Sequence, residues 1–321
     1  MKTTIPVEER KFSFEVNGRM IQAALTTPGP GGAGWGIVLI AGSGPSDVDG
    51  NWPDDPMWPG KTHVYADLGR QFAALGVASL RFGRGDAVTV DEAKFAGHNR
   101  FSERIIVAAA AVRALRERAP GLARIAVAGH SEGSVVGSLL LTEREDLDVR
   151  AFISLAGPAW RFFDLMLRQI KGFAEDGMLE FGQVKMPLSL YELSVQVVRN
   201  AQPVPDYLKA IPWGFHSMPE EGKQYLRDYD SVDNSEVISR VKCPVLLVQG
   251  GLDASVLPDN ADKLIEARRS SGFRTDKVFF PELDHMFKQA PPGQPFARLN
   301  NQEVDERVSR AIRDWLTGLD V

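Results

Sequence analysis

The stretch Gly129-His130-Ser131-Glu132-Gly133 decides the fold prediction, because it places one serine between two glycines directly after an apolar run. Residues 124–128 before it read as a buried strand, and residues 134–141 after it read as a helix with several small side chains. A strand that turns directly into a helix needs glycines on both sides of the corner so that the two backbones can pass. The pattern predicts an exposed serine hydroxyl at the carboxyl end of the strand, where it can act as a nucleophile.

Strand-like and helix-like segments alternate along most of the 321 residues. After a hairpin that turns at Asn17-Gly18, we expect strands at 37–40, 77–82, 124–128, 151–155, 244–248 and 277–280, and helices at 65–75, 101–119, 134–141, 260–269 and 304–316. This alternation predicts an α/β fold with a mostly parallel sheet and helices on both faces. Ligands of such sheets bind at the carboxyl ends of the strands, where Ser131 is expected.

The alternation stops between Pro158 and Ser235. Apolar residues at helical spacing predict helices at 160–173 and 188–198, and prolines interrupt the rest. We expect residues 1–157 and 236–321 to form the α/β core, and residues 158–235 to form a mainly helical cap inserted after the strand that follows the nucleophile. Such a cap would present an apolar wall to the site, although its Met and aromatic side chains can also be its own packing core.

A serine hydroxyl becomes a strong nucleophile only when a base removes its proton and an acid orients that base. Of the five histidines, only His285 follows the last predicted strand at the edge where the base is expected, and His98 is the next candidate. Asp253 lies just past the strand at 244–248, where it can accept the second imidazole N–H. Asp284, the sequence neighbour of His285, is the rival acid.

The order Ser131, Asp253, His285 resembles the α/β-hydrolase fold superfamily, and the resemblance covers nearly the whole chain. The chain is most similar to a bacterial esterase branch with a Gly-Ser-Gly-Pro-x-Asp loop, a Gly-His-Ser-Glu-Gly elbow and a mid-chain cap. Here the loop spans residues 42–47. Ala41 stands where the branch usually has a histidine, and residues 81–85 loosely match its basic-Gly element.

This resemblance implies hydrolysis of carboxylic esters through a serine acyl-enzyme, with no cofactor and no metal. It also implies that the backbone N–H groups of Ser43 and Glu132 hold the oxyanion. The Glu132 side chain is expected to buttress the corner rather than to contact substrate. A thioesterase or an acyltransferase would use the same groups, and a hydrolase-fold binding protein that has lost catalysis is the alternative outside enzymes.

Composition and charge give no sign of nucleic acid or a membrane span as a partner, and the resemblance implies a small-molecule ester as the substrate. The net charge is −5, whereas proteins that bind nucleic acid usually carry a basic patch. No apolar stretch of the sequence approaches the ~18 residues of a membrane span. The single cysteine, Cys243, and a polar start without the core of a secretory signal suggest a cytoplasmic location. The histidines show no metal-ligand spacing.

The sequence leaves open whether the chain forms a homodimer through an edge strand or through the cap. Trp52, Met57 and Trp58 either flank the acyl pocket or pack on the surface.

Overall fold

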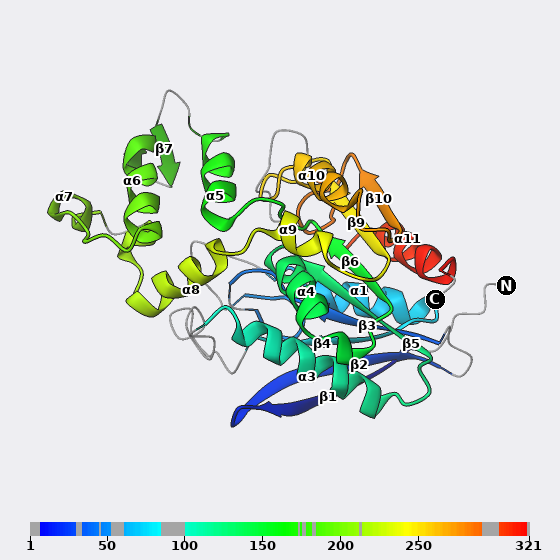
Figure 1. Ribbon diagram of the computed structural model, residues 1–321. Helices are drawn as coiled ribbons and strands as arrows, with labels where there is room; N and C mark the ends of the chain where they lie inside the picture. Colours follow the sequence, from blue (N-terminus) through cyan, green and yellow to red (C-terminus); the bar gives the residue numbers. More distant parts are fainter. Residues whose placement is uncertain are drawn as a thin grey trace.

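The computed structural model of the protein describes residues 7–29, 34–44, 46–52, 61–84, 100–172, 174, 178–181, 184–211, 214–290 and 302–319. Eight strands form one sheet in the order β1-β2-β4-β3-β5-β6-β9-β10 (Figure 1). The strands are β1 (Val7–Val16), β2 (Arg19–Pro28), β3 (Trp35–Ile40), β4 (Ala78–Phe82), β5 (Arg124–His130), β6 (Ala151–Leu155), β9 (Val245–Gly250) and β10 (Thr275–Phe280). Every neighbouring pair from β4 to β10 is parallel, whereas β1–β2 and β2–β4 are antiparallel. The predicted α/β fold with a mostly parallel sheet is confirmed.

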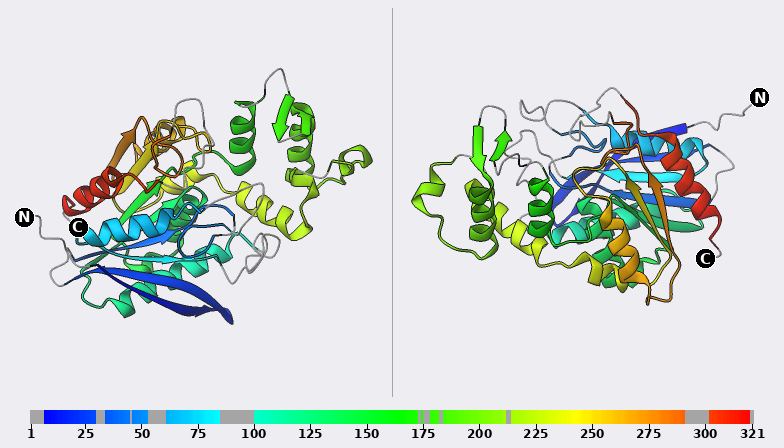
Figure 2. Two further views of the ribbon diagram at one scale, coloured as in Figure 1. Left: turned by 180° about the vertical axis from the view of Figure 1, so that it is seen from behind. Right: turned by 90° about the horizontal axis from the view of Figure 1, so that it is seen from above.

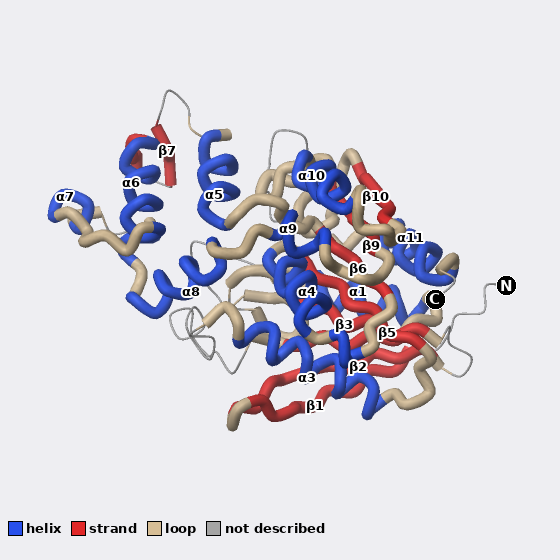
Figure 3. The backbone as a smooth tube through the Cα atoms, in the orientation of Figure 1, coloured by secondary structure: helices blue, strands red, loops and turns tan. Residues whose placement is uncertain are grey.

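Helices cover both faces of this sheet (Figure 3). On one face lie α1 (Val64–Ala74) and α11 (Glu306–Thr317), which pack against each other. The other face carries α3 (Glu103–Arg118), α4 (Glu132–Glu143), α9 (Asn234–Ser239) and α10 (Asp259–Arg268), and a short 3-10 turn, η1 (Glu145–Leu147), follows α4. Each of the core helices expected from the sequence is present, and its bounds lie within about two residues of the expected ones. For example, α4 begins at Glu132, two residues before its expected start.

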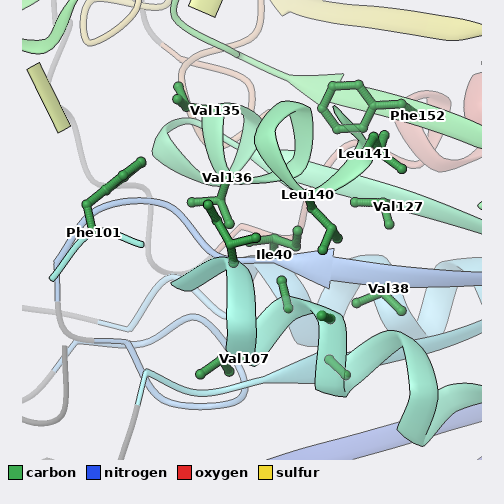
Figure 4. Packing of buried hydrophobic residues seen from close by; sticks show 14 of the residues in the cluster. Val38, Ile40, Phe101, Val107, Val127, Val135, Val136, Leu140, Leu141 and Phe152 are labelled. Atoms are coloured by element: carbon green, nitrogen blue, oxygen red, sulfur yellow. The ribbon is translucent and has the colours of Figure 1, made fainter. Parts of the chain in front are cut away.

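A separate hydrophobic core fills each side of the sheet, because the central strands are apolar on both faces. The side that carries α4 packs Val127 and Phe152 of the sheet against Val136 and Leu140 of the helix (Figure 4). All four side chains are fully buried. Burial of this kind on both faces is typical of parallel sheets, and it holds the carboxyl ends of the strands in a fixed arrangement.

The predicted hairpin turn at Asn17-Gly18 is also confirmed. Both residues have positive φ, 50° for Asn17 and 76° for Gly18. A two-residue turn of this type matches the right-handed twist of its strands, and Asn-Gly adopts it readily.

The inserted segment, residues 158–235, lies between β6 and β9 and projects to one side of the core (Figures 1 and 2). Its described elements are α5 (Phe162–Lys171), β7 (Met178–Phe181), β8 (Val184–Pro187), α6 (Leu188–Arg199), α7 (Asp206–Lys209), η2 (Phe215–Ser217), α8 (Glu220–Asp230) and the first residues of α9. The helices expected at 160–173 and 188–198 correspond to α5 and α6, whereas α8 and the β7–β8 hairpin were not expected. Over the described ranges, no helix is long and apolar enough to cross a membrane.

Candidate active site

Ser131 occupies the corner between β5 and α4, as the glycine pattern predicts. Its backbone has φ 54° and ψ −125°, a conformation that is costly for a residue with a Cβ and that persists only where its surroundings enforce it. Both flanking glycines are required by contact. A Cβ on Gly129 would lie 2.2 Å from the carbonyl oxygen of Gly133, and a Cβ on Gly133 would lie 2.3 Å from that of Ile40. The corner therefore closes only with this sequence pattern.

The structure brings Asp253 to His285 across 32 residues of sequence. Nδ1 of His285 lies 2.8 Å from Oδ2 of Asp253, whose side chain is fully buried. The other carboxylate oxygen accepts the backbone N–H groups of Ser255 and Val256 at 2.9 and 2.8 Å. Because a carboxylate only accepts, His285 carries its proton on Nδ1 and presents the Nε2 lone pair. Burial lowers the pKa of His285, but the Asp253 charge and hydrogen bond outweigh it and raise that pKa above 6.5.

Asp284, the rival acid, accepts hydrogen bonds from the backbone rather than from the His285 ring. Its Oδ1 accepts the backbone N–H groups of Met286 and Lys288 at 2.9 and 2.8 Å, which holds the turn after His285. The loop after β9 and the loop after β10 are also joined through their backbones, because Leu252 N–H donates to Leu283 O at 2.9 Å. The contact between Asp253 and His285 therefore rests on two loops that are bound to each other.

A chain of hydrogen bonds connects the His285 loop to the loop after β3. Gly42 N–H donates to Tyr65 Oη at 2.8 Å, and Tyr65 Oη lies 3.0 Å from Nδ1 of His130. Nε2 of His130 lies 2.9 Å from the backbone oxygen of His285, which can only accept. His130 must therefore be protonated on Nε2 and accept the Tyr65 hydroxyl proton at Nδ1. Burial, followed by the nearby His285, lowers the pKa of His130 to about 3, so it stays neutral and serves to connect the two loops.

Ser131 and His285 lie at the same edge of the sheet, since the rings of His130 and His285 are 4.7 Å apart between centroids. Among the described residues, no hydrogen bond joins Ser131 Oγ to the His285 ring. Such contacts are often long in ligand-free enzymes and tighten when substrate binds. The Ser131 side chain is partly exposed.

The loop after β3 lies directly against the corner. A Cβ on Gly42 would be 3.1 Å from Ser131 Cβ, so the Gly42–Ser43 peptide passes next to the serine. Within the part of the chain that the structure describes, neither Ser43 N–H nor Glu132 N–H has a hydrogen-bond partner. Two unpaired N–H groups beside a serine are what an oxyanion needs.

The Glu132 side chain turns away from the serine into a buried cluster. Its carboxylate accepts hydrogen bonds from Arg104, from Tyr225 Oη and, at 2.7 Å, from Ser43 Oγ. Burial raises the pKa of Glu132, but the Arg104 and Arg84 guanidiniums outweigh it and lower that pKa to about 2. Glu132 is therefore charged and fixes the side chains around it, which agrees with the structural role at the corner that the sequence predicts.

Sequence reasoning missed three of the side chains that hold this site: Tyr65, Arg104 and Tyr225. Arg104 carried a detectable signal, because it is a charged residue among the apolar buried positions of α3. Tyr65 and Tyr225 carried none, since a tyrosine on a helix is ordinary core composition. Their roles follow only from contacts between distant parts of the chain.

The remaining histidines and the residues expected beside the acyl pocket have other positions. His63 precedes α1 and lies beside Asn51, and His216 is buried in the inserted segment against Ser194. Trp52 packs its ring against Gly44. His98, Met57 and Trp58 lie outside the described residues. No group of three or more His, Cys, Asp or Glu side chains in the described ranges is close enough to hold a metal ion.

Comparison with known proteins shows similarity to esterases. No protein-family model matches the chain. Esterase EstD of Thermotoga maritima is 26% identical over 314 residues, which cover 97% of this chain and 68% of that protein.

Two solved structures share the fold at low sequence identity. Est1E from Butyrivibrio proteoclasticus superposes with a TM-score of 0.54 at 15% identity, covering 95% of this chain and 97% of that one. An esterase of Pyrococcus furiosus superposes with a TM-score of 0.56 at 14% identity, covering 96% and 90%. With the strand order above, these similarities show that the chain has the α/β-hydrolase fold.

Proposed function

We propose that this protein hydrolyses carboxylic esters of small to medium apolar substrates through an acyl-enzyme on Ser131. The esterase relative, which matches 97% of the chain, supports the expectation of an enzyme of this class. The observation that carries the mechanism is the arrangement at the corner. A strained serine stands beside two unpaired N–H groups, and an imidazole fixed by a buried carboxylate lies at the same edge of the sheet.

In the first step, Nε2 of His285 takes the Ser131 proton while Oγ attacks the ester carbonyl carbon. The negative charge that develops on the carbonyl oxygen is held by the N–H groups of Ser43 and Glu132. His285 then gives its proton to the leaving alkoxide, so the alcohol departs and the acyl group stays on Ser131. Water repeats the sequence on the acyl-enzyme and releases the acid. Asp253 keeps His285 in the required tautomer and stabilises the imidazolium in both steps.

The loop around Ser43 supports a finer assignment to the bacterial esterase branch that the sequence resembles. In this chain the loop is fixed by Tyr65 on one side and by Arg84 and Arg104 on the other. These contacts fix the loop in a chain that has Ala41 where the branch usually has a histidine.

We propose that the inserted segment is the cap of this site, with residues 1–157 and 236–321 as the core. Its helix α8 reaches the corner through Tyr225. Its aromatic side chains form a buried cluster in which Phe162 contacts Tyr229 with ring centroids 5.0 Å apart and Phe215 at 5.6 Å. These rings serve as the segment's own core, which is one of the two roles that the sequence leaves open for them.

The test is a panel of p-nitrophenyl esters of increasing acyl length together with acyl-CoA thioesters. We expect ester turnover that falls to background in Ser131→Ala and is kept in the control Ser138→Ala, which removes another serine hydroxyl close by on α4. A fluorophosphonate should modify the wild-type protein at Ser131 only. Turnover of thioesters alone would indicate a thioesterase, and labelling with no turnover of any substrate would contradict the hydrolase.

The cap is tested separately with a variant in which the chain between α5 and α6 is shortened. We expect its acyl-length preference to change more than its rate on the acetyl ester. An unchanged preference would contradict the cap assignment while leaving the hydrolase intact.

A further inference from the structure

Four side chains from four separate elements meet behind the corner. They are Arg84 just after β4, Arg104 on α3, Glu132 on α4 and Tyr225 on α8. The side chains of Arg104 and Glu132 are only 4% and 2% exposed, and that of Arg84 is 12% exposed. One member of this cluster, Tyr225, belongs to the inserted segment. The cluster therefore links that segment to the core at the proposed catalytic site.

The two guanidiniums hold the carbonyl oxygens of the loop after β3. Arg104 donates to Ala41 O, and Arg84 Nη1 donates to Gly44 O at 2.9 Å and to Gly42 O at 3.4 Å. In a trans peptide the C=O and the N–H point in opposite directions. Holding the Gly42 oxygen on the Arg84 side therefore turns Ser43 N–H to the other side of the same peptide. Arg84 thus sets the direction of one proposed oxyanion donor.

Tyr225 in turn holds Arg84. Arg84 Nη2 donates to Tyr225 Oη at 3.0 Å, and the guanidinium carbon lies 5.7 Å from the centre of the tyrosine ring. Tyr225 Oη in turn donates a hydrogen bond to the Glu132 carboxylate. The direct approach of Arg84 to Glu132 is longer, 3.8 Å. The tyrosine hydroxyl is therefore the bridge through which the buried carboxylate fixes the arginine.

We propose that Tyr225 is a positioning residue that aligns the oxyanion site through Arg84, so that docking of α8 and assembly of the Gly42–Ser43 donor are coupled. The inference rests on the proposed ester hydrolysis and deepens it. It gives the inserted segment a role in the rate of the chemical step, in addition to any role in substrate selection. A segment that only lined the pocket would change KM and chain-length preference and leave the oxyanion site unchanged.

The test compares Tyr225→Phe with a matched control, Tyr229→Phe. Tyr229 lies one turn further along α8 and is buried, and its ring stacks on Phe101 at 4.7 Å. Its hydroxyl has no hydrogen-bond partner among the described residues, so the control removes the same atom from the same helix without touching Arg84. Both variants are checked for folding by far-UV circular dichroism and thermal melting.

For Tyr225→Phe we expect kcat on a p-nitrophenyl ester to fall by roughly tenfold, less than the 10²–10³ for full loss of an oxyanion donor. KM should change little. The inhibition constant of a trifluoromethyl ketone, whose adduct carries an oxyanion, should rise by the same factor as kcat/KM falls. A methyl ketone of the same chain length should bind as before. The Tyr229→Phe control should match wild type in all four measurements.

A double variant shows whether the loss of kcat in Tyr225→Phe acts through Arg84. Arg84→Lys keeps a charge but lacks the fork that reaches two carbonyls and the tyrosine. If Tyr225 acts through Arg84, adding Tyr225→Phe to Arg84→Lys should cost nothing further.

Additive losses, a change in KM alone, or equal behaviour of the two tyrosine variants would each overturn the inference while wild-type hydrolysis stands. A wild-type protein that hydrolyses no ester would overturn the proposed function, and the inference with it.

Discussion

Replacing Tyr65 by Phe tests whether the hydrogen-bond chain beneath the corner is real. In the structure the hydroxyl accepts Gly42 N–H at 2.8 Å and donates to His130 Nδ1 at 3.0 Å. Tyr65 and His130 are only 5% and 3% exposed, so water cannot easily replace the lost partner. The substitution keeps the aromatic ring and leaves two buried polar groups without a partner.

The expected cost follows from those two groups. Each buried donor or acceptor left unsatisfied costs about 1–3 kcal/mol, so Tyr65→Phe should lower the free energy of unfolding by roughly 2–6 kcal/mol. A loss of this size is a large share of the 5–15 kcal/mol that is typical of folded proteins. Urea unfolding followed by far-UV circular dichroism and tryptophan fluorescence measures it, with an unchanged slope if only stability is affected.

The matched control is Tyr191→Phe. Tyr191 is 7% exposed, and its hydroxyl has no hydrogen-bond partner among the described residues. We expect its unfolding midpoint to stay near that of wild type. If Tyr65→Phe unfolds at the wild-type urea concentration, or if both variants lose the same stability, the hydroxyl does not join Gly42 to His130 and the chain of contacts is wrong.

Three further perturbations follow from the same geometry. Asp253→Asn should lower kcat by about 10⁴-fold through the wrong His285 tautomer. Because the Asp253 charge raises the pKa of His285, and the base must be neutral, the acid limb of the kcat/KM profile should also move to lower pH. Gly133→Ala should give a strongly lowered melting temperature or insoluble protein, since its Cβ would lie 2.3 Å from a backbone oxygen of Ile40. His130 has a folded pKa of about 3, below its ordinary 6.5, so the unfolded chain binds more protons between those values. Its contribution to stability should be complete above about pH 6.5 and lost as pH falls toward 3, by at most ~1.4 kcal/mol per pH unit. Urea midpoints across that range, with His130→Gln showing a smaller slope, are the measurement.

The corner at Ser131 could be predicted because its requirements are local. The glycines at 129 and 133 are needed for backbone approach within a few residues, and a five-residue pattern contains that information. The hairpin turn at Asn17-Gly18 is similar, since both residues tolerate positive φ. The positions of Asp253 and His285 followed from the rule that functional side chains gather where parallel strands end.

The inserted segment could be predicted only in part, because helical spacing indicated α5 and α6 but not α8. Helix α8 did carry a start signal, with Pro219 before it and Glu220 and Glu221 in its first turn. Pro219 was interpreted as one of several breaks instead. Even a correct helix prediction would not have found the contact of Tyr225 with Glu132, which joins residues 93 positions apart. Contacts at that separation depend on the packing of the whole chain.

The buried cluster around Glu132 is better explained by the proposed reaction than by folding. Taking charges out of water costs several kcal/mol per ion, and apolar side chains of similar size are often at least as stable. Among the described residues, this cluster places the guanidiniums of Arg84 and Arg104 near the Glu132 carboxylate. These positive charges lie behind the Gly42–Ser43 peptide, where they would favour the oxygen that becomes negative during the proposed attack by Ser131. Apolar side chains would carry no positive charge and could not donate hydrogen bonds to the loop carbonyls. Stability alone therefore gives no reason to bury these charged side chains.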